Sequence, residues 1–380
     1  MRVVVTTEAR FRRREHRGGA GPAGRKVVLA PSVDLGYQRW ASCLGVFDEV
    51  VVLARVAGPE DGPAPGAVSE PGYVVEGPGV RVVPLPDCRG LAGYLATGHR
   101  LRAAVREALA AAGALGDGDA ARPEACCIAT VPGLVGATAI AELRRHDVPY
   151  AIEVGADAEA AVSGPLRPLV GRCVRGWQAR VCAQAPAVGY LTRELLQRRY
   201  PPNRGAATAW YAHSRLRDAD FARHPRPAAA RPPAPARLLA AVPREGDRRG
   251  HDVLVDAVML LRAWRHPVLA TVVGTPPRPG GLLPAVLRRG RADLGGLDEV
   301  VDFVADHDRA LLDSTDLLVL PSRLEGLPPL LLDAMARGVP VIAAEAGVAA
   351  ELLAPRDLVP PGDAESLAAR VAEVLGSPRR

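Results

Sequence analysis

Two carboxylates frame the start of a short apolar helix late in the chain. Glu325 follows a predicted buried strand, Leu317 to Leu320, and Asp333 lies eight positions further on, inside a helix predicted from about Pro328 to Arg337. Gly338 then ends that helix. Free N–H groups and the helix dipole attract an anion to a helix N-terminus. A strand that delivers a Glu-Gly turn to this point therefore predicts a phosphate-binding site.

Strands that alternate with helices must position this segment. The alternation predicts parallel, doubly wound sheets. It is interrupted once, by a proline-rich stretch, and this divides the chain into an N-terminal domain, a linker and a C-terminal domain at residues 1–222, 223–236 and 237–380. Prolines forbid regular structure and stiffen a linker. Two such domains place a ligand in the cleft between them, and the last helix can pack back toward the first domain.

The composition argues against a nucleic-acid partner in spite of a formal net charge of +6. Lys26 is the only lysine among 48 basic residues, and Asn203 is the only asparagine, a usage typical of GC-rich coding bias. The arginines are scattered, and aromatic residues, on which bases would stack, make up 4% of the chain. We therefore expect small-molecule substrates.

The six cysteines show no C-x-x-C pair and no metal-ligand spacing, which predicts reduced, mostly buried thiols. No window approaches eighteen uninterrupted apolar residues, and the N-terminus reads as a first strand instead of a signal peptide. These features predict a cytoplasmic protein without a transmembrane segment. They carry no signal for the oligomeric state.

A Gly- and Arg-rich stretch from about Glu8 to Gly24 follows the first predicted strand, residues 2–7. It reads either as a surface loop or as a ligand-binding loop, because open α/β sheets bind ligands at the carboxyl ends of their strands.

The segment from Asp316 to Pro340 resembles the donor-binding motif of the GT-B glycosyltransferases, in particular glycosyltransferase family 4 (group 1). In that family a Glu, seven residues and a second Glu hold the sugar and the ribose of a nucleotide-sugar. The resemblance assigns Glu325 to the sugar hydroxyls, Gly326 and Leu327 to the adjoining turn, and Asp333 to the ribose. Asp333 is one methylene shorter than the usual Glu. The implied fold is GT-B, two Rossmann-like doubly wound parallel-sheet domains facing across a cleft.

A second loop, Pro243 to Gly250, resembles the phosphate clamp of the same family, usually Gly-Arg, a few residues, then Lys-Gly. Arg244 matches the Arg and Arg249 matches the Lys. Both are expected to neutralise the diphosphate, whose departure builds negative charge. Arg248 is interpreted as a solvated basic residue. Gly274 resembles the strand-end glycine near the nucleotide.

On the acceptor side the resemblance points to Asp157, which stands where family members present a His or Asp after the strand at residues 149–154. A loop aspartate that caps the next turn is an equal alternative. Glu8 and Arg10, after the first strand, are further acceptor-side candidates.

Three Asp-x-Asp triplets occur, at residues 117–119, 218–220 and 306–308. Such a triplet holds a divalent metal in a different class of glycosyltransferase. Three unrelated matches make the pattern unspecific, and the arginines can neutralise a diphosphate. We therefore expect a UDP-sugar co-substrate, no metal and no tightly bound cofactor. No G-x-G-x-x-G follows the first strand, which argues against NAD.

Three N-terminal pieces, residues 3–11, 45–56 and 148–154 with 190–202, resemble glycosyltransferases of aminoglycoside antibiotic and cell-surface polysaccharide synthesis, most of all the 2-deoxystreptamine N-acetylglucosaminyltransferases. The resemblance implies retaining transfer of a hexose, N-acetylglucosamine from UDP-GlcNAc, onto an aminocyclitol such as 2-deoxystreptamine. The alternatives are a relative acting on polysaccharide or other glycosides, a nucleotide-sugar 2-epimerase, which the few histidines disfavour, and a degenerate, non-catalytic partner protein.

Overall fold

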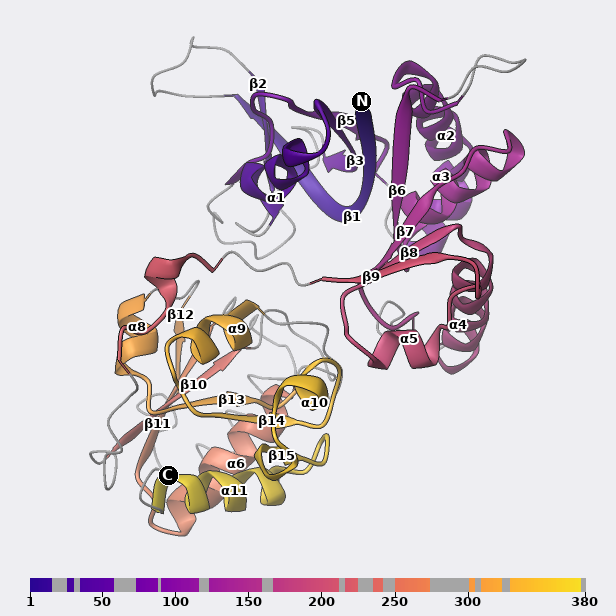
Figure 1. The fold of residues 1–380 in the computed structure, drawn as a ribbon. Coiled ribbons are helices and arrows are strands. Elements are labelled where there is room, and N and C mark those ends of the chain that lie inside the picture. The colour runs from indigo at the N-terminus through magenta and orange to yellow at the C-terminus, as the bar shows by residue number, and fades with distance from the viewer. Residues whose placement is uncertain are drawn as a thin grey trace. The chain divides into compact units, whose positions relative to one another are not determined.

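The computed structural model describes residues 1–15, 26–30, 35–57, 73–87, 90–115, 123–158, 167–211, 216–224, 235–241, 250–273, 301–304, 309–322 and 329–376. The chain forms two compact units, Met1–His213 and Ser214–Arg380 (Figure 1). Ala222, just before the predicted linker, belongs to the second unit, and its N–H donates to the Ala336 carbonyl at 2.9 Å. Most of the linker lies outside the described residues.

The first unit is built on a parallel sheet. Its strands lie in the order β5 (Val80–Leu85), β3 (Glu49–Ala57), β1 (Arg2–Glu15), β6 (Ala125–Val131), β7 (Ala151–Val154), β8 (Ala187–Tyr190) and β9 (Ala207–Trp210). The carboxyl ends of these strands share one edge of the sheet, where open α/β folds bind ligands.

Strand β1 corrects one prediction. The loop expected from Glu8 is strand as far as Glu15, so Glu8 and Arg10 lie within β1 and not after it. The register with β3 shifts between Thr6 and Arg10, and beyond this irregularity β1 also pairs antiparallel with β2 (Lys26–Ala30), which pairs with β4 (Tyr73–Val74). Phe11, fully buried, anchors the extension in the core.

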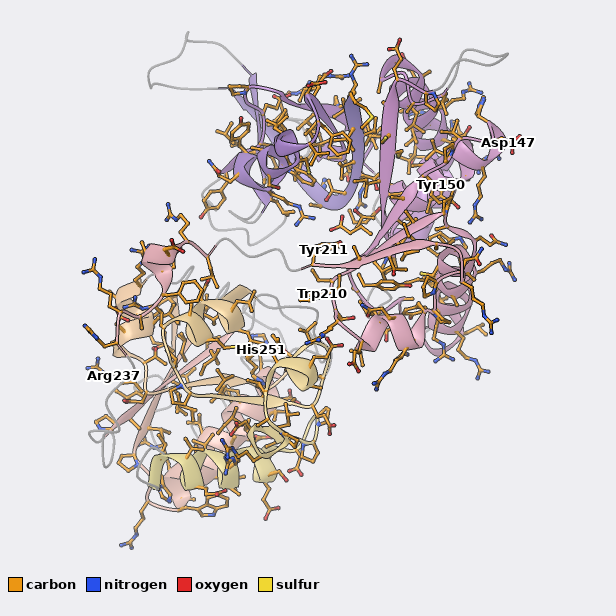
Figure 2. All side chains as sticks on the ribbon, in the orientation of Figure 1. Asp147, Tyr150, Trp210, Tyr211, Arg237 and His251 are labelled. Carbon is orange, nitrogen blue, oxygen red and sulfur yellow. The ribbon has the colours of Figure 1, made fainter. Side chains whose placement is uncertain are left out.

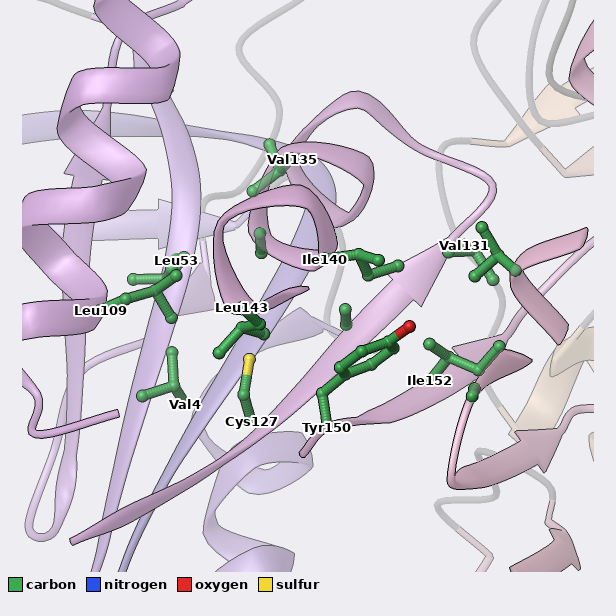
Figure 3. Close-up of a cluster of buried hydrophobic side chains, with 14 of the residues drawn as sticks. Val4, Leu53, Leu109, Cys127, Val131, Val135, Ile140, Leu143, Tyr150 and Ile152 are labelled. Atoms are coloured by element: carbon green, nitrogen blue, oxygen red, sulfur yellow. The ribbon is translucent and has the colours of Figure 1, made fainter. Parts of the chain in front are cut away.

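Both faces of the first sheet are covered. Val4, Val51 and Leu53 face a core that includes side chains of α2 (Gly90–Ala111), α3 (Leu134–Arg145) and α4 (Arg167–Gln184), as Figure 3 shows in part. Val3 and Val5 face the opposite core, which contains Trp40 of α1 (Tyr37–Ala41). Because neighbouring strand residues point to opposite faces, two apolar layers require continuous apolar runs. Helix α5 (Leu195–Arg199) follows β8.

The second unit has a fully parallel sheet in its described residues. Its order is β12 (Val301–Val304), β11 (Val268–Val273), β10 (Ala236–Ala241), β13 (Leu317–Leu320), β14 (Val341–Ala344) and β15 (Leu358–Val359). Helices α6 (His251–Ala263) and α11 (Ala364–Gly376) cover one face, while α8 (Arg309–Ser314) and α9 (Pro329–Ala336) cover the other (Figure 1). Helix α10 (Ala349–Leu352) follows β14.

The predicted strand and helix around Asp333 are confirmed. All four residues of β13 are buried, with Leu317 and Val319 in the α6–α11 layer and Leu318 and Leu320 in the α8–α9 layer. Gly338 has a φ of +65°, the left-handed conformation of a helix-ending glycine. The predicted fold class of two doubly wound parallel-sheet units is confirmed. In the described residues no helix is long and apolar enough to cross a membrane.

The core of the first unit gives a stability prediction. Leu143 of α3 is fully buried (Figure 3), whereas Leu169 of α4 is 67% exposed. Leu143→Ala should lower the free energy of unfolding by about 2–5 kcal/mol through lost burial and a residual cavity. Leu169→Ala is the matched control and should change it by less than about 0.5 kcal/mol. Equal midpoints of urea denaturation in the two variants would contradict this assignment of the core.

Candidate functional site

Two loops of the second unit leave the same edge of its sheet. Strands β10 and β13 are hydrogen-bonded neighbours and parallel, with Leu239 opposite Leu318. The loop after β10 holds Arg244 and Arg249, and the loop after β13 holds Glu325, Gly326 and Leu327. These five residues, and Gly274 after β11, lie outside the described residues. Strand pairing nevertheless requires both loops to begin side by side.

Two residues that border these segments are in direct contact. Gly250 ends the segment that contains Arg244 and Arg249 and directly precedes α6, and Pro321 is the first residue after β13. A Cβ at Gly250 would lie 2.2 Å from the Pro321 carbonyl oxygen, so only glycine allows the backbones to approach this closely. Gly250 also has a φ of +74°, a left-handed conformation that other residues rarely adopt. The residue that ends the segment after β10 and the residue that begins the segment after β13 are therefore in contact at the N-terminus of α6.

Gly250 is the last residue of the motif that resembles a phosphate clamp, but the sequence did not predict it as a site residue. Its neighbour His251, labelled in Figure 2, is buried at the start of α6. Asp333, one turn into α9, is half-buried, and its backbone carbonyl accepts the Arg337 N–H at 3.1 Å. Leu330, Leu331 and Ala334 anchor α9 in the core and so fix the helix that carries Asp333.

In the first unit, Glu8 lies against the N-terminus of α3. Its Oε1 accepts the N–H groups of Val135 at 2.7 Å and Gly136 at 3.3 Å, and Leu134 adds a third backbone hydrogen bond. Arg55 lies 3.4 Å from its Oε2. Burial raises the pKa of the Glu8 carboxyl, and Arg55 and the backbone N–H groups oppose that shift. Glu8 therefore fills the position where a helix N-terminus would hold an external anion.

Arg10, on the extended part of β1, forms an ion pair with Asp87, which follows β5. It stands opposite Arg55 in the β1–β3 register. The two guanidinium groups therefore belong to neighbouring strands, and each has its own carboxylate.

Asp157, just after β7, is held from two directions. The Tyr200 hydroxyl donates to its Oδ1 at 2.7 Å, and Arg199 lies 2.8 Å from its Oδ2. Burial, and then the hydrogen bond to Asp157, raise the pKa of Tyr200 to about 12. Asp157 is thus placed at the carboxyl edge of the sheet by α5 and the residue after it.

Sequence reasoning missed a buried network beside these residues. Glu153 of β7 lies 3.2 Å from the Arg39 guanidinium and accepts the Thr130 hydroxyl at 3.2 Å. Tyr211, labelled in Figure 2 at the end of β9, also interacts with Glu153, and burial followed by that carboxylate raises the pKa of Tyr211. Glu153 stands in an apolar strand, and its partners are far away in sequence, so no local signal marks it.

Four arginine–carboxylate pairs thus lie along the carboxyl edge of the first sheet. We call them the paired edge, defined by Arg55–Glu8, Arg10–Asp87, Arg39–Glu153 and Arg199–Asp157. Glu8, Arg10 and Asp157 were predicted from the sequence as acceptor-side residues. Their roles toward an acceptor stay predictions.

In the described residues no group of three or more His, Cys, Asp and Glu side chains could hold a metal ion. Of the three Asp-x-Asp triplets, residues 218–220 are described, and there Asp220 forms an ion pair with Arg309. The hydrogen bond from the Arg217 backbone and then Arg309 lower the pKa of Asp220. The absence of a metal requirement stays a prediction.

Known proteins share this architecture. The structure of a sucrose-phosphate synthase from Thermosynechococcus elongatus matches 99% of this chain and 90% of that chain, with a TM-score of 0.66 and 18% identity. HepE of Anabaena, solved in complex with UDP-glucose, matches 98% of this chain and 89% of its own, with a TM-score of 0.59 and 15% identity. This chain has the GT-B fold. At these identities the likeness defines the GT-B architecture alone.

Sequence similarity concentrates in part of the chain. Residues 237–377, which hold the β10 and β13 loops, match the family described as Glycosyl transferases group 1. The amylovoran biosynthesis glycosyltransferase AmsK of Erwinia amylovora is 32% identical over 148 residues, 36% of this chain and 35% of that protein. The chain spans about a third of the length of the curated relatives it matches.

Close packing at Gly250 gives a second prediction. Gly250→Ala should lower the free energy of unfolding by about 1–3 kcal/mol, because a Cβ meets the Pro321 carbonyl and the φ is strained. It should also weaken UDP binding, measured by calorimetry, because the start of α6 can no longer lie against Pro321. Gly376→Ala is the control, since a Cβ there meets nothing within 4 Å. Wild-type thermal stability and UDP affinity in Gly250→Ala would refute the close approach.

Proposed function

We propose that the protein is a retaining glycosyltransferase that uses a UDP-sugar and acts in glycoconjugate or polysaccharide synthesis. The observation that carries this proposal is the contact between Gly250, which follows Arg244 and Arg249 in the sequence, and Pro321, which precedes Glu325. The match of residues 237–377 to group 1 glycosyl transferases supports it, as does the UDP-glucose complex of HepE.

In this proposal the second unit holds the donor. Arg244 and Arg249 neutralise the diphosphate, Glu325 binds the sugar hydroxyls, and Asp333 binds the ribose, with Gly326, Leu327 and Gly274 lining the nucleotide. The bond between the anomeric carbon and the diphosphate breaks, and the acceptor oxygen bonds to that carbon on the same face. The acceptor proton passes to the departing diphosphate. Catalysis then rests on positioning and on stabilising the charge of the leaving group.

The specific donor and acceptor in this proposal are N-acetylglucosamine and an aminocyclitol such as 2-deoxystreptamine, as in aminoglycoside antibiotic biosynthesis. Its support is the resemblance of the N-terminal pieces described above. The relationship to AmsK favours polysaccharide synthesis as the alternative setting. Asp157, Glu8 and Arg10 are proposed to lie on the acceptor side, and the protein is proposed to act in the cytoplasm.

The Arg loop provides a test with an internal control. Arg244→Ala and Arg249→Ala should each lower kcat about 10²- to 10³-fold, because each removes a fixed cation from the developing diphosphate charge. Arg248→Ala, in the same loop and of the same charge, should stay within about threefold of wild type because a solvated arginine contributes little. Steady-state kinetics of UDP release measure all three variants. Equal losses of kcat in all three variants would contradict specific roles for Arg244 and Arg249 and would indicate a general effect of positive charge.

The acceptor assay separates the competing functions. The protein is incubated with UDP-GlcNAc and 2-deoxystreptamine, with and without EDTA, and products are identified by mass spectrometry. A glycoside formed in both conditions is the expected result. A change at C2 of the UDP-sugar without glycoside would identify an epimerase. Tight UDP binding with no turnover on any amino sugar or glycan acceptor would identify a non-catalytic partner protein. Full turnover in Glu325→Ala would contradict the assignment of Glu325 to the donor site.

A further inference from the structure

Each arginine of the paired edge already forms an ion pair with a carboxylate of the protein. The four arginines come from β1, β3, α1 and α5, and each lies against an Asp or Glu of the same unit. Arg39 and Arg55 are 18% and 16% exposed, so their pairs sit largely out of water. An incoming anion would have to separate such a pair, leaving a partly buried carboxylate without its partner, which costs far more than a surface contact returns.

Glu8 occupies the N-terminus of α3, which is the other position in this unit where an anion could bind. Helix α3 is twelve residues long, and its first N–H groups point at the Glu8 carboxylate. Gly133 makes room for that side chain, because a Cβ there would lie 2.1 Å from the Glu8 Cγ. Gly136 lets α3 approach β6, because a Cβ there would lie 2.0 Å from the Thr130 carbonyl oxygen. The helix N-terminus and Glu8 are therefore held together by backbone packing on both sides.

We propose that the paired edge selects an acceptor that carries no phosphate or carboxylate, an uncharged or cationic polyhydroxyl compound, and that Glu8 is the residue that sets this selection. This inference rests on the proposed function and names the acceptor class of the same reaction. Carboxylates accept hydrogen bonds from hydroxyl and ammonium groups, and they repel a phosphate ester. Discrimination comes from the repulsive element as much as from the attractive one.

The electrostatics of Glu8 agree with a functional role. Burial outweighs Arg55 and the backbone donors and raises the pKa of Glu8, so the fold disfavours a carboxylate at the position where Glu8 contacts α3. Glu8→Gln keeps the shape and an acceptor oxygen for α3 without that charge.

The test compares Glu8→Ala with Glu8→Gln in the full-length protein. Inorganic phosphate is titrated by calorimetry in the presence of saturating UDP, which occupies the diphosphate site of the second unit. Glu8→Ala frees the α3 N-terminus and should bind phosphate on the order of tenfold more tightly than wild type. Glu8→Gln keeps the N–H groups occupied but removes the repelling charge, and should bind it more tightly than wild type and less tightly than Glu8→Ala. No gain in Glu8→Ala would overturn the inference.

Kinetics test the same selection with substrates. The ratio of kcat/KM for a sugar acceptor to that for its phosphate ester should be large in wild type and fall about tenfold in Glu8→Ala. A wild-type preference for the phosphate ester would overturn the inference. If Glu8→Ala does not fold, Glu8→Gln carries the test, because it removes the repelling charge while keeping an acceptor for the N–H groups of α3. Absence of transfer to every acceptor would refute the proposed function, whereas the phosphate titration would still decide the role of Glu8.

Discussion

The close approach of Gly250 to Pro321 is the contact on which the candidate donor site depends. Strands β10 and β13 are parallel neighbours, and that pairing alone brings two loops to one edge. The glycine then lets the start of α6 sit against the end of β13, with a Cβ position only 2.2 Å from a carbonyl oxygen. The contact joins the borders of the segments that contain Arg244 and Arg249 on one side and Glu325 on the other, residues that are proposed to bind a sugar diphosphate.

The arginines of the two units are proposed to have different partners. In the second unit, Arg244 and Arg249 precede α6 in the sequence and are proposed to bind a diphosphate. The first pairs the arginines of its paired edge with its own carboxylates and fills the N-terminus of α3 with Glu8. A transferase needs this asymmetry, because a leaving diphosphate must be stabilised while an acceptor hydroxyl must be free to approach. In the proposed function the paired edge offers the acceptor hydrogen-bond acceptors without net positive charge.

Much of the second unit could be predicted from the sequence because its signals are local. The β13 run is uniformly apolar, and Gly338 ends α9 as its position in the sequence indicates. The extension of β1 was missed because Phe11 stands between Arg10 and three consecutive arginines, which hide a strand whose pairing depends on residues 26–30. The role of Glu8 could not be read from sequence, since its hydrogen-bond partners at Val135 and Gly136 are more than a hundred residues away. Glu153 escaped notice for the same reason.

The central claim is that a nucleotide diphosphate binds where the β10 and β13 loops meet. Hydrogen–deuterium exchange with and without UDP tests it most directly, because it reads the backbone of both loops in the intact protein. The account predicts that UDP slows exchange in peptides covering residues 242–252 and 321–333 and leaves α4 of the first unit unchanged. Unchanged exchange in those two segments, under conditions where calorimetry records UDP binding, would contradict it.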